Sequence, residues 1–315
     1  MVAARTEQSE SWGLAQPGML IGHGRNLHRA VQVRLPLVNT APRAIHHLNC
    51  ATMCPRGARL IAGSGGLLAS ARLVCHCLLI EGAEGLVLID TGFGLEDTRN
   101  PRQLGLPFTM VVRPRADAAE TAISQIRELG FEPGDVRHIV TTHLDLDHAG
   151  GLPDFPDAEV HLLGTELDAA MHPGWRERAR YIAAHWAHGP RWSRHDAGGD
   201  EWFGFDSVRI LPGSDAEILL IPLPGHTLGH TGVAVRRSDG WILHCGDAYF
   251  HHGEVQTPAH CPAGLRAFQA VNQVDGEARR QNAERLRELA HEHGDEVELI
   301  CSHDAGTFDR YAGAA

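Results

Sequence analysis

One short stretch of the chain concentrates side chains that can bind metal ions. Four of them fall within six residues, spaced as H-x-D-x-D-H: His143, Asp145, Asp147 and His148. The apolar run 138–140 before them is typical of a buried strand, and Gly150 and Gly151 allow a sharp turn directly afterwards. An acidic surface loop that contains histidine is the alternative. The spacing and the two glycines favour a metal site.

Four more apolar runs end in polar groups of the same kinds. Upstream, Leu86-Val87-Leu88-Ile89 leads to Asp90. Downstream, three runs lead to His226 with His230, to Asp247 and to His303. Each run predicts a strand, and each polar group follows the end of its strand. The downstream groups are of the types that would complete a site for two metal ions.

These five strand-and-ligand units resemble the ordered motifs of the metallo-β-lactamase superfamily, over roughly residues 73–305. The resemblance implies an α/β fold, an αββα sandwich of two mixed sheets flanked by helices. It also implies a ligand set: His143, Asp145 and His226 on a first metal, Asp147, His148 and His303 on a second, and Asp247 bridging the two. Asp90 would orient a ligand, and His230 would lie outside the ligands.

Asp145 departs from the family pattern, because most hydrolytic members have histidine at this position. An extra carboxylate lowers the Lewis acidity of the first metal and shifts its preference toward harder ions such as iron or manganese. Carboxylate oxygen also binds zinc at normal distances. We therefore expect two divalent metal ions, zinc first, with iron or manganese as alternatives because of Asp145.

Within the superfamily the chain is most similar to the N-acyl-homoserine lactone lactonases. The shared segments are 130–133 (GFEP), 147–151 (DHAGG), 224–226 (PGH) and 302–304 (SHD). The expected reaction is attack on a lactone or ester by water activated between the two metals. Asp147 would pass a proton to the leaving group. Tyr249 would donate to the oxyanion, although it lies one residue nearer to Asp247 than the tyrosine of those enzymes, and a packed tyrosine is the alternative.

Other functions stay open at this point. Hydrolysis of a β-lactam or a thioester would use the same site. Flavodiiron proteins also have a carboxylate at the position of Asp145, so a di-iron redox protein is an alternative. Those proteins need a flavin domain after the last histidine, and only twelve residues follow His303. A binding protein without catalysis would not need every ligand position filled.

Composition restricts the partners. The formal net charge is −11, with no lysine, and the chain has no basic run for nucleic acid. An acidic chain favours a neutral or apolar small-molecule substrate, because an anionic one would be repelled. No stretch is long and apolar enough for a membrane span, and residues 1–16 lack the apolar core of a secretory signal. We expect a cytoplasmic protein, whose oligomeric state the sequence leaves open.

The seven cysteines are scattered and lie mostly in apolar runs. Buried reduced thiols are the expected state, with a metal or redox pair at Cys50 and Cys54 or at Cys75 and Cys77 as the alternative.

The remaining chain divides into an N-terminal extension, residues 1–44, and a catalytic domain, residues 45–315. Apolar spacing predicts a helix over 116–129 and another over 277–293, and residues 92–115 are expected to form an irregular loop over the cleft. The insertion 172–205 contains Trp175, Trp186, Trp192 and Trp202. These tryptophans would either form an apolar wall for a hydrophobic substrate or pin the insertion to the domain.

Overall fold

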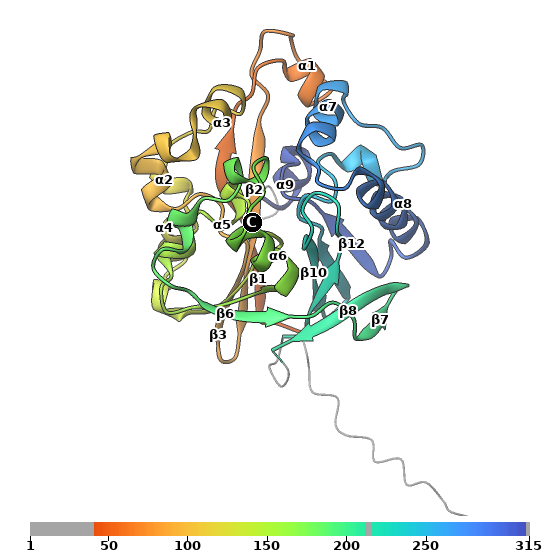
Figure 1. The fold of residues 1–315 in the computed structure, drawn as a ribbon. Helices are drawn as coiled ribbons and strands as arrows, with labels where there is room; N and C mark the ends of the chain where they lie inside the picture. The colour runs from red at the N-terminus through yellow and green to blue at the C-terminus, as the bar shows by residue number, and fades with distance from the viewer. Residues whose placement is uncertain (1–40, 212–215, 313–315) are drawn as a thin grey trace, which may run out of the picture. The chain divides into compact units, whose positions relative to one another are not determined.

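The computed structural model describes residues 41–211 and 216–312 of the chain. Residues 1–40, most of the expected N-terminal extension, lie outside the described residues. The described part is built on two six-stranded sheets (Figure 1).

The first sheet has the strand order β1-β2-β3-β4-β5-β6 and is mixed. Its strands β1 to β3 pair antiparallel, and β3 to β6 pair parallel. The strands are β1 (Ala44–Met53), β2 (Leu73–Gly82), β3 (Gly85–Ile89), β4 (Val136–Val140), β5 (Glu159–Leu163) and β6 (Arg191–His195).

The second sheet has the order β12-β11-β10-β9-β8-β7. It is antiparallel except for the parallel pair β11–β12, so it is also mixed. The strands are β7 (Asp200–Trp202), β8 (Phe205–Ile210), β9 (Ile218–Pro222), β10 (Thr231–Arg237), β11 (Gly240–His244) and β12 (Val297–Ile300).

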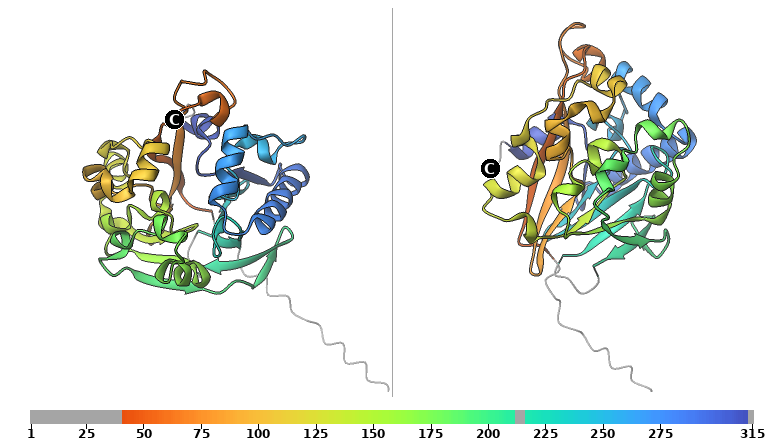
Figure 2. Two further views of the ribbon diagram at one scale, coloured as in Figure 1. Left: turned by 45° about the horizontal axis from the view of Figure 1, so that its top comes forward. Right: turned by 60° about the vertical axis from the view of Figure 1, so that its left-hand side comes forward.

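Helices flank both sheets (Figures 1 and 2). Beside the first sheet, Ile123 and Ile126 of one helix pack into the same apolar cluster as the outer faces of the strands. Leu286 and Leu289 of another do so beside the second sheet. The helices are α1 (Ala58–Ile61), α2 (Leu95–Arg99), α3 (Leu106–Val111), α4 (Ala122–Glu128), α5 (Leu146–Ala149), α6 (Gly164–Met171), α7 (Ala263–Asn272), α8 (Gly276–Glu292) and α9 (Ala305–Ala312).

The two sheets face each other across a core of aliphatic side chains. Alternate residues of β2, β3 and β4 meet those of β9, β10 and β11 there, because successive side chains of a strand point to opposite faces. The core includes Leu78, Ile80, Ile89, Val140, Leu220, Val233 and Ile242, each fully buried. This layer fixes the distance between the sheets, and both deliver candidate ligands to one edge.

Several predicted elements differ from the structure. The predicted helix 116–129 is the shorter α4, preceded by a single 3₁₀ turn. The predicted irregular loop 92–115 contains α2 and α3, and the insertion 172–205 contains β6 and β7. These elements are short, so they carry too few residues for a clear apolar period. Helix α8 matches its prediction to within one residue at each end. Asp275 caps its N-terminus by accepting hydrogen bonds from the Glu277 and Ala278 amides.

No helix among the described residues is long and apolar enough to cross a membrane. All seven cysteines are free thiols, and five of them are buried. The expectation of buried reduced thiols is confirmed for these five positions.

The core between the sheets gives a stability prediction. Leu220→Ala removes a fully buried side chain from this layer and should lower the free energy of unfolding by about 2–5 kcal/mol. Denaturant unfolding of metal-free protein measures it. An exposed leucine, Leu68, is 85% accessible, so Leu68→Ala is the control that should leave stability unchanged. A loss below 1 kcal/mol at Leu220 would contradict this account of the core.

Candidate metal centre

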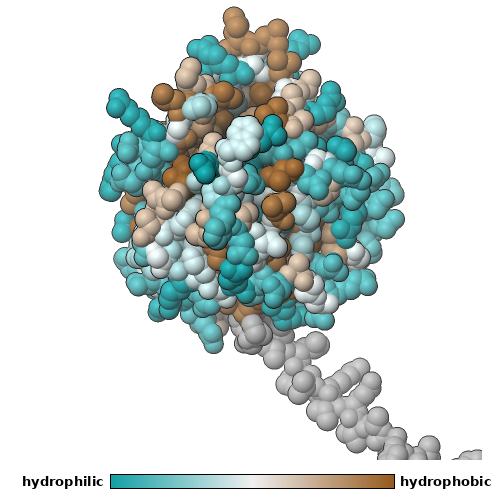
Figure 3. All heavy atoms as spheres, in the orientation of Figure 1, coloured by the Kyte–Doolittle hydropathy of each residue, from teal (hydrophilic) through white to brown (hydrophobic). Residues whose placement is uncertain are grey.

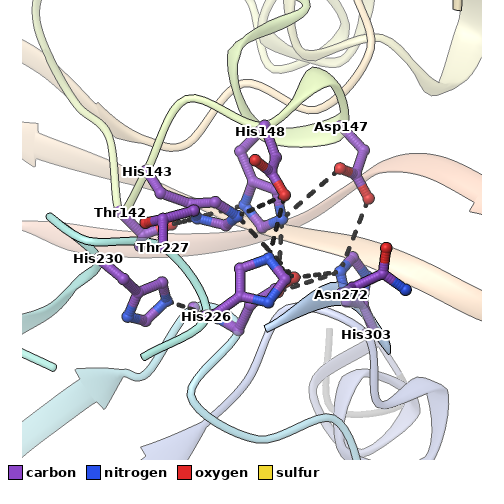
Figure 4. A network of polar contacts seen from close by, with 12 residues as sticks. Thr142, His143, Asp147, His148, His226, Thr227, His230, Asn272 and His303 are labelled. Carbon is purple, nitrogen blue, oxygen red and sulfur yellow. Dashed lines mark hydrogen bonds and ion pairs between the residues drawn. The ribbon is translucent and has the colours of Figure 1, made fainter. Parts of the chain in front are cut away.

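The ends of four strands, one from the first sheet and three from the second, bring the predicted ligands together (Figure 4). The turn after β4 carries His143 and Asp145 and leads into α5, which carries Asp147 and His148. The turn after β9 carries His226. Asp247 follows β11, and His303 follows β12. The structure thus brings all seven side chains to the same edge of the sandwich.

Asp247 lies between two pairs of histidines. Its Oδ2 is 3.9 Å from Nε2 of His143 and 3.4 Å from Nε2 of His226. Its Oδ1 is 3.4 Å from Nε2 of His148 and 3.1 Å from Nε2 of His303. Nε2 of His303 also lies 3.3 Å from Oδ2. The carboxylate therefore lies between the two pairs, which is the geometry of a bridge between two positions.

The other two carboxylates each serve one pair. Asp145 Oδ2 lies 3.0 Å from Nε2 of His226 and 3.5 Å from Nε2 of His143. Asp147 is 3.7 Å from Nε2 of His303 and 4.0 Å from Nε2 of His148. Asp147 is the most exposed of the three side chains, at 13%.

Three histidines are held from behind through Nδ1. The Nδ1–H of His143 can donate to Thr142 Oγ1 at 2.9 Å, and that of His303 to the Val74 carbonyl at 2.8 Å. The Nδ1–H of His148 can donate to Asp90 Oδ2 at 2.8 Å. Each bond leaves the lone pair of Nε2 directed at the carboxylates, which is the tautomer a metal ligand needs.

Asp90 and His230 support the centre without facing it. Asp90 adopts a left-handed backbone, with φ 53°, and its carboxylate accepts from the amide and hydroxyl of Thr142 as well as from His148. His230 can donate from Nδ1 to the Leu223 carbonyl and accept from the Asp247 amide at Nε2. It therefore fixes the backbone of Asp247, and its ring nitrogens are both engaged.

The donor set fits divalent cations. The Nε2 atoms of His143 and His148 and Oδ1 of Asp247 are buried without any hydrogen-bond partner, and such orphaned atoms are rare unless something else satisfies them. His143, Asp145 and His226 form one group close enough to hold an ion, and His143, His148 and Asp247 form another. Imidazole nitrogen and carboxylate oxygen are suitable ligands for zinc, manganese and iron.

Electrostatics in the metal-free site follow from burial and the three carboxylates. Burial alone would lower the pKa of His148, but Asp247, Asp90 and Asp147 around it raise that pKa well above its ordinary value. Asp247 and Asp147 likewise raise the pKa of His303 against its burial. Burial acts to raise the pKa of Asp247, and the facing His303 and His148 bring it well below its ordinary value. A proton on either histidine and a metal cation bound there would therefore be stabilised by the same carboxylates, so the two compete.

Tyr249 does not lie with these residues. Its side chain is 2% exposed and packs into the apolar cluster behind the second sheet. Burial and the neighbouring thiol of Cys245 raise its pKa well above the ordinary value. The next residue, Phe250, packs instead against the rings of His226 and His303, with centroids 5.9 and 4.9 Å apart. The position of Tyr249 therefore does not support hydrogen-bond donation from its hydroxyl to an oxyanion at this centre.

Sequence reasoning missed two buried residues that contact this centre. Glu166 of α6 is fully buried and accepts from the Leu144 amide, the Thr227 hydroxyl and the Gly229 amide. Its carboxylate therefore links the turn that carries His143 to the turn that carries His226 through hydrogen bonds. Arg180 lies 3.4 Å from Asp145. A charged residue that packs against the centre from a helix or an insertion has no local spacing that marks it, so neither role has a signal in the sequence.

The Sγ atom of Cys75 lies close enough to a carboxylate oxygen of Asp147 and a ring nitrogen of His303 for the three to hold one metal ion. Burial, then Asp147, raises its pKa well above the ordinary value, so the group is a neutral thiol in the metal-free protein. Cys77, two residues on, packs in the apolar cluster on the other face of β2. The two cysteines therefore do not form a pair.

Two histidine groups away from this centre also have closely spaced ligand atoms: His138, Glu159 and His161, and His251, His252 and Asp304. In the first, His161 contacts ring nitrogens on both sides, at 3.0 and 3.1 Å. In the second, Asp304 accepts from the amide and ring of His252 and from the Thr307 amide. Hydrogen bonds satisfy these groups without an ion.

Comparison with known proteins agrees with this geometry. The sequence profile of the Metallo-beta-lactamase superfamily matches residues 71–292. A probable metallo-hydrolase of Mycobacterium tuberculosis is 42% identical over 270 residues, which cover 85% of this chain and 83% of that protein. The N-acyl homoserine lactonase AttM of Agrobacterium fabrum is 28% identical over 210 residues, or 65% of this chain and 77% of the lactonase.

Solved structures share the fold. An N-acyl homoserine lactone hydrolase with the product N-hexanoyl-L-homoserine bound at its catalytic metal center superposes with a TM-score of 0.65 at 19% identity, covering 86% of this chain and 96% of that one. AidC, a dizinc quorum-quenching lactonase, gives a TM-score of 0.53 at 16% identity, with 83% and 87% covered. The expected αββα sandwich is confirmed.

The raised pKa values of His148 and His303 predict that zinc binding is strongly pH-dependent. Both rings therefore hold a proton more tightly than a free imidazole does, and each must lose that proton to bind a metal. Zinc affinity should therefore rise by about tenfold per pH unit for each proton displaced as pH increases from 6 to 8. Competition with a chromophoric chelator measures the slope.

Asp90→Asn is the matched variant, because it removes a carboxylate that raises the pKa of His148. The rise of zinc affinity with pH should be shallower in this variant than in the unaltered protein. Equal zinc affinity at pH 6 and pH 8 in the unaltered protein would contradict the electrostatic description.

Proposed function

The chain is a hydrolase of the metallo-beta-lactamase superfamily, and we propose that it uses two divalent metal ions to open a lactone or ester that carries an apolar acyl group. The observation that carries the proposal is the position of Asp247 between two pairs of imidazole nitrogens, of which those of His143 and His148 have no hydrogen-bond partner. We assign His143, Asp145 and His226 to one ion, and Asp147, His148 and His303 to the other. Asp247 contacts both.

Zinc is the first candidate for both positions, and manganese or iron remain alternatives because Asp145 adds a hard oxygen ligand. Bound divalent ions supply Lewis acidity, which lowers the pKa of water and polarises the substrate carbonyl. The chain's own residues supply the rest. Asp247 offsets the repulsion between two cations, and the bonds at Nδ1 hold three imidazoles in place.

Asp147 is the residue that we assign to proton transfer. Its carboxylate is the most exposed of the three at the centre, so a substrate can reach it. In the reaction a water oxygen bonds to the carbonyl carbon and the carbon–oxygen bond of the ring or ester breaks. Asp147 takes the proton that the water loses and gives it to the leaving oxygen. The products are an alcohol and a carboxylic acid, which loses its remaining proton to solvent at neutral pH.

An apolar cluster beside the centre offers a place for an acyl chain. It includes Leu146, which lies between two of the candidate ligands in sequence. Its half-buried members include Phe108 of α3, Ile182 of the insertion and Phe268 of α7. Phe268 also packs against Phe250, with ring centroids 6.0 Å apart. Further apolar side chains are exposed on α1, α3 and α7, toward the same end of the molecule (Figure 3).

Of the two roles considered for the tryptophans of the insertion, their positions favour pinning the insertion over forming an apolar wall for a substrate. Trp186 and Trp192 pack against the cluster behind the first sheet, and Trp202 is buried behind the second. Trp175 is 82% exposed. The three packed tryptophans hold the insertion against the sheets. We assign the proposed contact with substrate to the phenylalanines of α3 and α7 instead.

The similarity to lactonases named for N-acyl homoserine lactones supports this substrate class. A neutral lactone also suits a chain with a net charge of −11. The cytoplasmic location and the absence of a nucleic-acid partner stay predictions from the sequence.

The proposal predicts hydrolysis of at least one N-acyl homoserine lactone, simple lactone or aryl ester by protein loaded with zinc, manganese or iron. Activity should stop with a chelator and return with metal. Asp147→Asn should lower kcat by about a hundredfold or more, because it removes the proton carrier. A β-lactam and a thioester complete the panel. No hydrolysis in the panel, together with oxygen consumption by the iron form, would favour a di-iron redox protein instead.

A second prediction concerns the acyl chain. Phe268→Ala should lower kcat/KM more for a decanoyl than for a butanoyl substrate, because each methylene that loses an apolar contact costs about 0.8 kcal/mol, or about fourfold. Trp175→Ala is the control, since its side chain is exposed. An equal loss for short and long substrates would show that Phe268 does not contact the chain.

A further inference from the structure

Arg180 brings a buried positive charge to the metal centre. It follows a 3₁₀ turn in the insertion, and its side chain is only 14% exposed. Its Nε lies 3.4 Å from Asp145 Oδ1, and its two terminal nitrogens donate to the carbonyls of His226 and Asn272 at 3.0 and 2.6 Å. Burial acts to lower its pKa, but Asp145 raises it above the ordinary value, so the guanidinium stays charged.

The two oxygens of Asp145 have different partners. Oδ2 faces His226 and His143, where we assign a metal. Oδ1 faces Arg180 and accepts no hydrogen bond, so its contact with the guanidinium is an ion pair. A carboxylate that shares its charge with a guanidinium is a weaker electron donor to a metal on its other oxygen.

The charge count shows what this pairing does. Two divalent ions bring four positive charges and the three aspartates bring three negative ones, which leaves one positive charge. A histidine in place of Asp145 would leave two. The guanidinium of Arg180 restores the second positive charge, so Asp145 and Arg180 together carry the same net charge as a neutral histidine.

The segment that holds Arg180 is fixed to both ligand turns. The hydroxyl of the next residue, Tyr181, donates to Glu166 Oε1 at 3.1 Å, and Glu166 also accepts from Leu144 and Thr227. Glu166 packs so closely on Gly229 that a Cβ there would lie 2.2 Å from the Glu166 amide. The position of Arg180 is therefore set by the same side chain that joins the two turns.

We propose that Arg180 is a positioning residue that neutralises Asp145, so that the carboxylate acts on the first metal as a histidine would. Arg180 thereby restores the Lewis acidity that a carboxylate in place of a histidine would otherwise remove. This inference rests on the proposed metal centre, but its first test needs no substrate.

The test is a cycle of four proteins, each prepared without metal and titrated with zinc against a chromophoric chelator. Arg180→Gln removes the charge and keeps an amide donor. It should bind zinc about tenfold more tightly, the order of effect of a change beside a ligand, because Asp145 is no longer neutralised. Asp145→His leaves the guanidinium uncompensated and should bind about tenfold more weakly. The double variant should return close to the affinity of the unaltered protein.

Arg180→Lys keeps the charge and should bind zinc like the unaltered protein. Arg178→Met is the matched control, because Arg178 lies two residues earlier and is exposed. Thermal unfolding of each variant checks that it is folded. If Arg180→Gln does not fold, Asp145→Asn serves as the second arm. It leaves Arg180 in place and should bind zinc more weakly, and unchanged affinity there would overturn the inference.

A purely structural Arg180 gives the opposite result: weaker zinc binding in Arg180→Gln, with no recovery in the double variant. Weaker zinc binding in Arg180→Gln would overturn the inference, and so would a double variant that does not recover. With an active substrate, the acidic limb of the kcat/KM profile of Arg180→Gln should also move to higher pH by about one unit, because the metal acidifies water less. If no substrate in the panel is hydrolysed, the zinc affinities still decide the role of Arg180, so the two proposals fail separately.

Discussion

Three aspartates and four histidines lie almost completely buried within a few ångströms of one another, and the rest of the structure depends on keeping them there. Buried carboxylates repel one another and attract protons unless opposite charge offsets them. The carboxylate oxygens of Asp247 lie within 3.9 Å of all four imidazoles. Two cations, one on each side of this carboxylate, would satisfy every unpartnered nitrogen at once. The charge distribution is therefore an argument for a dinuclear site that is independent of the family resemblance.

The sandwich supplies this arrangement because its strands end at one edge. Ligands from four strand ends can meet only if the sheets keep a fixed spacing, which the aliphatic layer between them provides. Support from behind is equally specific. Asp90, in a left-handed conformation, holds His148 and Thr142, and Glu166 holds the turns of His143 and His226. His143, His148 and His303 are thus each oriented by a hydrogen bond to a residue that does not itself face the metals.

Much of the site could be predicted from the sequence, because ligands that follow strands leave a local signal. The stretch from His143 to His148 and the later His226, Asp247 and His303 are visible as polar groups after apolar runs. Glu166 and Arg180 could not be found in this way, since their contacts lie 22 or more residues away in sequence. Tyr249 illustrates the opposite error. Its spacing from Asp247 suggested an active-site role, but the backbone after β11 turns its side chain into the apolar cluster and brings Phe250 to the histidines.

The fold shows the same division between long and short elements. The strands β3, β4, β9, β11 and β12 and the helix α8 have clear apolar patterns and were predicted, whereas α2, α3, β6 and β7 are three to six residues long and were not. Among the segments with such elements, α3 and the insertion contribute side chains to the apolar cluster beside the centre. The part of the chain that would select a substrate is thus the part that sequence periodicity describes least.

The central claim is that two metal ions share Asp247. Anomalous diffraction at the zinc absorption edge, from crystals of zinc-loaded protein, tests it most directly. The account predicts two peaks about 3.5–4 Å apart, with one oxygen of Asp247 bound to each and Asp145 bound to the ion beside His143 and His226. A single peak, or two peaks without Asp247 between them, would contradict it.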